Sequence, residues 1–173
     1  MENLYYEFTV PVFINSLNAL KGILMKGEEY AKANGRTEEE MLGLRLAEDM
    51  FPLVKQVQVA CDNAKGASAR LSGGTAPKME DNEKTFAELY TRIDKTVAYI
   101  SSLEVESFAG AADRIIKLPF FPEDSHFNGD GYARFFAIPN FLFHVVTAYD
   151  ILRANNVPIG KGDFTGMLPL VKD

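Results

Sequence analysis

The chain has 173 residues, the usual length of a single globular domain, and its 47% hydrophobic and 24% charged residues are proportions typical of soluble proteins. Its 24 acidic residues outnumber its 18 basic residues, and the net charge of −6 argues against a surface that binds nucleic acid or anionic membranes. The greasiest run, residues 135–146, is too short for a membrane span, which needs about 20 residues.

Cys61 is the only cysteine, so a disulfide within the chain is excluded. Its small apolar neighbours predict a buried side chain rather than a reactive thiol. The N-terminus carries early acidic residues and lacks a basic segment followed by an apolar core, so it does not resemble a signal peptide. We therefore expect a cytoplasmic protein with one domain, residues 1–173, and a tail, about 157–173, that packs on it.

The first predicted helix covers residues 5–34, because apolar residues recur there every three or four positions. This stripe consists of Val10, Phe13, Leu17, Leu20, Leu24 and Ala31. Thr9 is a candidate N-cap, and Gly35 is a candidate C-terminal stop.

Residues 36–48 contain a short acidic helix, in which Thr37 and Glu40 have the spacing of a reciprocal capping box. A second long helix follows at about 51–71, with Asp49 as its candidate cap and Pro52 in the first turn. Small residues on its apolar face would let another helix approach closely.

A linker rich in Gly and Pro, residues 72–77, leads to a third long helix that ends near residue 103. Asp81 or Asn82 is its candidate cap. Residues 104–127 have no helical periodicity and contain a short β-branched run, so a small β-hairpin or extended excursion is predicted.

The last long helix, residues 128–155, is apolar on nearly every side and must therefore be enclosed by other elements or by a second subunit. Asn128 is its predicted cap, Pro139 is expected to kink it, and Asn156 is expected to end it. Four long amphipathic helices and one short extra helix predict an all-α four-helix bundle.

A polar lane interrupts the apolar surface of this last helix. It consists of Asn140, His144 and Thr147, spaced i, i+4 and i+7, and Gln58 and Asp62 flank the apolar face of the second long helix. These five residues are the candidate ligand pocket, and His144 is the candidate metal ligand. The lane has three interpretations: a buried histidine satisfied by hydrogen bonds, an altered metal or ligand site, or an exposed or interface position.

Motifs of other sites are missing from the sequence. It has no phosphate-binding P-loop, no Cys pair for zinc and no Gly-x-Ser-x-Gly elbow, and two histidines cannot form a three-histidine metal site. His126 is expected at the surface of the 104–127 excursion. We expect no cofactor, with a divalent metal as the alternative.

Several separated motifs, in order along the chain, are similar to an uncharacterised subfamily of the DinB-like bundle proteins. They are residues 45–53 (RLAEDMFPL), 56–59 (QVQV), 85–89 (TFAEL), 139–144 (PNFLFH), 158–161 (PIGK) and 163–164 (DF). The resemblance covers about residues 5–164. It implies a bundle of the DinB and thiol-transferase superfamily, whose members often form dimers.

The resemblance also implies where a metal would bind. Metal-binding members use one histidine from the second helix and two, four residues apart, from the last. By motif, the last-helix pair falls on Asn140 and His144, and the second-helix ligand falls on or near Gln58. Amides replace two of the three imidazoles, so tight binding of a transition metal is not expected.

Three functions remain open at this stage. The first is a small-molecule-binding or non-catalytic bundle with a degenerate metal pocket formed by Gln58, Asn140 and His144. The second is a metal-dependent or thiol-conjugating transferase or hydrolase with His144 as ligand or general base. The third is a homodimeric structural or interaction protein that associates through a stripe on the last helix. That stripe consists of Ile138, Leu142, Val145, Tyr149 and Leu152.

Overall fold

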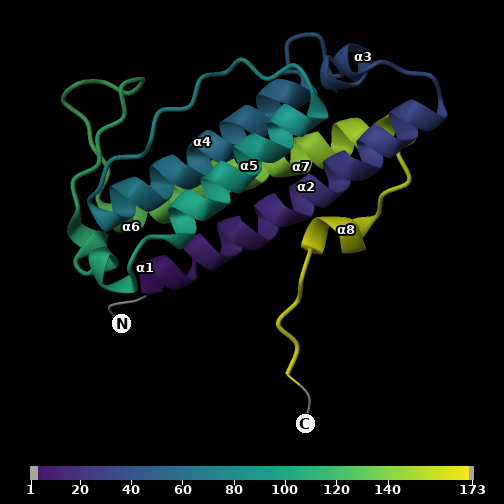
Figure 1. Cartoon of the computed structure of the whole chain (residues 1–173). Helices are drawn as coiled ribbons and strands as arrows, with labels where there is room; N and C mark the ends of the chain where they lie inside the picture. The colour runs from purple at the N-terminus through teal and green to yellow at the C-terminus, as the bar shows by residue number, and fades with distance from the viewer. Residues whose placement is uncertain (1–3, 172–173) are drawn as a thin grey trace.

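A computed structural model describes residues 4–171, and this part of the chain is a bundle of four long helices that lie side by side (Figure 1). The long helices are α2 (Val10–Ala33), α4 (Leu53–Ser72), α5 (Phe86–Ser101) and α7 (Ile138–Ala154). The short ones are α1 (Leu4–Glu7), α3 (Glu38–Leu42), α6 (Gly129–Tyr132) and α8 (Lys161–Thr165). The predicted all-α class is confirmed.

The first helix is divided in two, where the sequence predicts one helix. Thr9 precedes α2, but its hydroxyl donates a hydrogen bond back to the Tyr5 carbonyl and does not cap the helix. Pro11 then occupies the first turn of α2, where its missing N–H is tolerated. The predicted stop is confirmed, because Gly35 has a positive φ of 64° directly after the helix.

Capping explains where the next helices begin. Thr37 and Glu40 form the predicted capping box, although α3 is shorter than expected. Asp49 is not a cap, since α4 begins after Pro52. The prediction of Asp81 or Asn82 as the cap of α5 is also wrong.

Thr85 caps α5 instead, in a second capping box with Glu88. Asp81 lies outside the helix because its carboxylate pairs with Lys55 and Arg92. Asp81 is a residue type that often caps helices, but here it forms ion pairs within the linker and does not cap α5.

The predicted β-hairpin is not found in the excursion. Between the 3₁₀ segments η1 (Val105–Phe108) and η2 (Ala111–Asp113) and helix α6, the described chain has a single antiparallel bridge, Ile116–Phe127. Pro119 and Pro122 lie between the bridged residues and lack the N–H groups that a longer ladder would use.

The last helix begins at the predicted cap, because the Asn128 side chain accepts a hydrogen bond from the Gly131 N–H at 2.8 Å. Ahead of Pro139, where a kink is expected, the helix adopts a π-helical turn, η3 (Ala133–Ala137). Such wider turns occur where the regular hydrogen-bond ladder is interrupted. Asn156, with a φ of 67°, ends the helix as predicted.

One hydrophobic core runs through the bundle and includes the fully buried Phe13, Phe86 and Phe141. Cys61 is completely buried in it, and burial raises the pKa of its thiol to about 12, so the thiol is protonated at neutral pH. The prediction of a buried cysteine is confirmed.

The stripe predicted to contact a second subunit faces this core instead. Val145 and Leu152 are fully buried within the subunit, and Ile138, Leu142 and Tyr149 pack against the core. The large apolar side chains that α7 leaves exposed are different ones, Phe143 and Val146.

The residues after α7 return to α2. Phe164 of α8 packs edge-on against Tyr149, and the Asn15 side chain binds the backbone of Thr165 and Met167. The prediction that the tail packs on the bundle as far as Asp173 falls partly on residues 172–173, outside the described part.

Two helical stretches, Leu4–Ala33 and Gly129–Ala154, are long and apolar enough to cross a membrane by length and composition, with mean hydropathies of 1.3 and 1.4. In each window 44% of the residues are buried within the subunit. Core helices of soluble bundles meet the same criteria, so this finding is weak evidence for a membrane.

Candidate ligand-binding cleft

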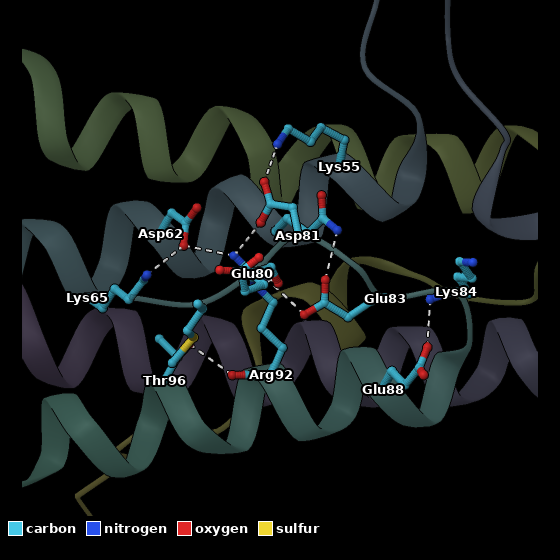
Figure 2. A network of polar contacts seen from close by, with 12 residues as sticks. Lys55, Asp62, Lys65, Glu80, Asp81, Glu83, Lys84, Glu88, Arg92 and Thr96 are labelled. Atoms are coloured by element: carbon cyan, nitrogen blue, oxygen red, sulfur yellow. Dashed lines mark hydrogen bonds and ion pairs between the residues drawn. The ribbon is translucent and has the colours of Figure 1, made fainter. Parts of the chain in front are cut away.

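Helix α4 carries polar side chains on two sides, and the first side faces α5. There Arg92 is almost fully buried, with 1% of its side chain exposed, and its guanidinium pairs with three carboxylates. Its nitrogens lie 2.8 Å from Asp62, 2.8 Å from Asp81 and 2.9 Å from Glu83 (Figure 2). We call these four residues the Arg92 cluster.

The Arg92 cluster attaches the linker between α4 and α5 to both helices. Asp81 and Glu83 come from the linker, and Arg92 also donates a hydrogen bond to the Glu80 carbonyl at 3.0 Å. Lys65 of α4 binds Asp62 at 2.9 Å and the Pro77 carbonyl at 3.0 Å.

Charge compensation within the cluster is extensive. Burial acts to raise the pKa of Asp81, but Lys55 and Arg92 outweigh it and hold that pKa below its usual range. The Nε of Arg92 is the one guanidinium nitrogen without a partner among the described residues. The cluster therefore acts as a structural clamp on a long linker.

Of the predicted site residues, Asp62 belongs to this clamp and Gln58 forms a hydrogen bond with it. The Gln58 amide donates a hydrogen bond to Glu83 at 2.8 Å, and Asp62 pairs with Arg92 and Lys65. Neither forms a hydrogen bond with the polar lane of α7 in the described part of the chain.

The second polar side of α4 faces α7, and on this side Gln56 contacts His144. The Gln56 amide nitrogen donates to the Phe51 carbonyl at 3.0 Å, which leaves its oxygen 2.7 Å from Nδ1 of His144. This arrangement places the imidazole proton on Nδ1, where it donates to Gln56, and leaves Nε2 with its lone pair. Burial lowers the pKa of His144, so the ring is neutral at pH 7.

One turn earlier on α7, Asn140 meets Asn63 of α4. The Asn140 amide nitrogen donates to the Asn63 side-chain oxygen at 3.0 Å. The amide nitrogen of Asn63 is buried and has no hydrogen-bond partner among the described residues. Thr147, the last residue of the lane, is satisfied within its own helix by the Phe143 carbonyl at 2.7 Å.

The polar lane thus pairs with Gln56 and Asn63 rather than with Gln58 and Asp62. A signal in the sequence was available: Gln56, Ala60, Asn63 and Ala67 are spaced by 4, 3 and 4, and the two alanines are fully buried. Small residues mark the face that receives another helix, so the polar residues in register with them are the ones that meet α7.

A cleft of about 450 Å³ opens beside the Asn63–Asn140 pair. Its polar lining comes from α4 and α7, and its apolar lining comes from Val59 of α4, the excursion, α6 and the π-helical turn. It is lined by Val59, Asp62, Asn63, Arg70, Leu118, Phe120, Tyr132, Phe136 and Asn140. A volume of this size, apolar walls and a few convergent polar groups are typical of small-molecule sites.

The excursion supplies one wall of the cleft through an aromatic cluster. Phe120 lies 5.9 Å from Phe136, and Phe136 stacks on Tyr132 with ring centroids 5.9 Å apart. His126, in contrast, is exposed on the excursion, as predicted.

Comparisons with known proteins place this geometry in a family. A family model described as a domain of unknown function (DUF1993) matches residues 5–165. The chain belongs to this family. No curated protein matches the sequence.

A solved structure extends the comparison of this DUF1993 chain to three dimensions. It is the crystal structure of a DinB family member protein from Shewanella denitrificans, 40% identical in sequence, with a TM-score of 0.95 over 99% of this chain and 97% of that one. The resemblance to an uncharacterised DinB-like subfamily is confirmed.

The side chains of this DUF1993 member do not fit the three-histidine metal site implied by the superfamily. His144 is a single imidazole whose Nδ1 is bonded to Gln56, and its neighbour on α7 is an amide, Asn140. Among residues 4–171, no group of three or more His, Cys, Asp or Glu side chains could hold a metal ion. Amides are poor ligands for the metals that prefer imidazole.

Proposed function

We propose that this protein is a small-molecule-binding bundle, and that the cleft beside Asn63 and Asn140 is its ligand site. On this proposal the position of the superfamily's metal is degenerate, and its polar residues serve hydrogen bonding. The buried amide nitrogen of Asn63 is the observation that carries the proposal. An unpartnered donor costs about 1–3 kcal/mol, and a ligand acceptor in the cleft would satisfy it.

A fragment screen by ligand-observed NMR tests the proposal. Val59→Phe would fill the cleft from α4, whereas Ile115→Phe places the same phenyl ring at a position that is 70% exposed. We expect hits that bind the native protein and the Ile115 variant and that are lost in the Val59 variant. Hits that survive Val59→Phe unchanged would contradict the proposal.

The enzymatic alternative rests on the free Nε2 of His144. A neutral imidazole with Nδ1–H held by Gln56 and a lone pair on Nε2 has the form of a general base. If the protein is such a transferase or hydrolase, His144→Ala abolishes turnover of its substrate. Full turnover by that variant would remove His144 from catalysis.

We also propose that the protein forms a twofold dimer through the exposed face of η3 and α7. Phe135 and Phe143 have 74% and 54% of their surface exposed, and Val146 adds to the same face. The Arg134 guanidinium lies 5.5 Å over the Phe135 ring at one end of this face, and exposed Asp150 lies on α7 toward the other. In an antiparallel pairing centred near Phe143, each Arg134 would face an Asp150 of the second copy.

Light scattering at micromolar concentration tests the dimer. We expect twice the monomer mass for the native chain and a monomer for Phe143→Glu, which places a charge at the centre of the face. The control Phe51→Glu changes another exposed phenylalanine, 52% exposed and ahead of α4, and should remain dimeric. A native monomer would contradict the dimer.

A further inference from the structure

The cleft is lined by Arg70, whose positive charge is not neutralised by an ion pair in the described part of the chain. Arg70, in the last turn of α4, donates a hydrogen bond to the Tyr132 hydroxyl at 3.2 Å, with its guanidinium 6.0 Å from the centre of that ring. None of the ion pairs in the described part of the chain includes Arg70. Its charge is left for a partner that comes from outside.

The backbone of α4 makes room for this guanidinium. Gly66 lies one turn before Arg70, and a Cβ at that position would come within 2.6 Å of Nη1 of Arg70. The glycine is buried in the middle of a long helix, where it costs about 1 kcal/mol relative to alanine. The recess at Gly66 allows the guanidinium to lie along the helix toward Tyr132.

Hydrogen-bond donors accumulate around the same cleft. Arg70 keeps its remaining N–H groups, and the Tyr132 hydroxyl, which accepts from Arg70, donates its own proton to no acceptor among residues 4–171. The amide nitrogen of Asn63 adds a third unpartnered donor. The acidic Asp62 also lines the cleft, but Arg92 and Lys65 compensate its charge.

The walls set the shape of the rest of the ligand. Tyr132, Phe136 and Phe120 present aromatic rings, and Leu118 and Val59 are aliphatic. Flat rings prefer offset or edge contacts with such side chains. One uncompensated guanidinium with two further donors matches one carboxylate, since a guanidinium binds a carboxylate through two parallel hydrogen bonds.

We propose that the cleft binds an organic monocarboxylate with a planar aromatic body, its carboxylate on Arg70 and Tyr132 and its ring against Phe136. This inference rests on the proposed ligand-binding function and specifies the ligand class. The carboxylate compensates the Arg70 charge, and the Asn63 amide, whose nitrogen is buried without a partner among the described residues, turns to donate to one of its oxygens.

A matched pair of probes tests the ligand class: indole-3-acetate and indole-3-acetamide, which differ in charge but hardly in shape. Titration calorimetry should show the acid binding at least about tenfold more tightly than the amide, the usual gain of a charge-assisted hydrogen bond. Added salt should weaken binding of the acid and leave binding of the amide unchanged.

Two variants assign the preference to Arg70. Arg70→Gln should lower the affinity for the acid to that for the amide. Gly66→Ala should also lower the affinity for the acid, because it displaces the guanidinium without removing its charge. Arg153→Gln, which removes an exposed arginine of α7, is the matched control and should bind like the native protein.

The outcomes separate this inference from the proposed function. If acid and amide bind equally and Arg70→Gln has no effect, the ligand class is wrong and the cleft remains a binding site. If neither probe binds at millimolar concentration, the ligand class is again wrong, and the fragment screen with Val59→Phe decides alone whether the cleft binds ligands.

Discussion

Arg92 of α5 and Arg70 of α4 have surroundings that differ in one respect, which separates a structural role from a role in recognition. Arg92 is held by three carboxylates from α4 and the linker, so the chain neutralises its charge. Arg70 has a tyrosine hydroxyl as its only side-chain partner in the described chain and lies in a cleft. A buried charge that is compensated internally fixes a fold, whereas a charge left uncompensated beside a cleft is available to a ligand.

The largest effect should come from the compensated arginine. Arg92→Met leaves Asp62, Asp81 and the largely buried Glu83 without their shared cation, so we expect a loss of about 3–5 kcal/mol in the free energy of unfolding. Urea denaturation measures it.

The control for this prediction is Lys78→Met. Lys78 pairs with Glu80 at 3.1 Å, but both side chains are largely exposed, at 88% and 73%. Such pairs contribute about 0–1 kcal/mol. Equal losses for the two variants would show that the Arg92 cluster is not a clamp.

A smaller effect is expected where α4 meets the polar lane. Gln56→Leu leaves the Nδ1–H of His144 without its acceptor in a buried site, which should cost about 1–3 kcal/mol. The double variant Gln56→Leu, His144→Leu removes both partners and should recover most of that loss, because no polar group then remains unsatisfied. A double variant less stable than the single one would contradict the pairing.

The same histidine should make stability depend on pH. Burial lowers the pKa of His144 in the folded state, so the unfolded state binds a proton more readily. Stability should therefore be fully present above pH 6.5 and fall as the pH drops below it, by at most about 1.4 kcal/mol per pH unit.

Thermal unfolding between pH 7.5 and 5.5 measures this slope in the native protein and in His144→Gln. The stability of the variant should change less with pH over that range. The lowered pKa of Asp81 acts in a separate window, because its stabilising contribution is lost only as the pH falls through the acidic range near 4 and below. Identical slopes above pH 5.5 would exclude His144 as the cause.

The smallest effect on stability should come from Arg70. Its guanidinium has no carboxylate partner to leave behind, so Arg70→Gln should change the unfolding free energy by no more than about 0.5 kcal/mol. This loss should be much smaller than the loss in unfolding free energy caused by Arg92→Met. A loss above about 2 kcal/mol would make Arg70 a structural residue like Arg92.

Local signals in the sequence predicted the fold well. Gly35, the Thr37 capping box, Asn128 and Asn156 act within one turn of their own helix ends, and each lies where the sequence placed it. The four long helices follow from apolar periodicity, which reports the buried face of each helix directly.

Features that depend on residues distant in the sequence were predicted less accurately. Asp81 looks like a cap but is held by Arg92, eleven positions later, and Thr85 takes its place. The β-branched residues near Ile116 suggested a hairpin, but Pro119 and Pro122 allow only one bridge.

The candidate site shows the same limit. Gln56 and Gln58 are both amides at the edges of one apolar face, about 200° apart around the helix, and the sequence pattern alone does not say which of them faces α7. The polar lane of α7 was visible in the sequence because it lies within one helix, whereas its partners on α4, Gln56 and Asn63, depend on how the two helices pack. Arg70 was missed because its significance lies in having no ion-pair partner among the described residues, which depends on the packing of distant parts of the chain.

The most direct test of the cleft as a ligand site is a side-chain NMR titration of the native protein with a cleft-binding fragment or with indole-3-acetate. The amide groups of Asn63 and Asn140 and the guanidinium of Arg70 report on the cleft, and the guanidinium of Arg92 reports on the clamp in the same spectrum. We predict saturable shifts of the first three signals and an unchanged Arg92 signal. Binding that leaves Asn63, Asn140 and Arg70 unshifted would contradict the account.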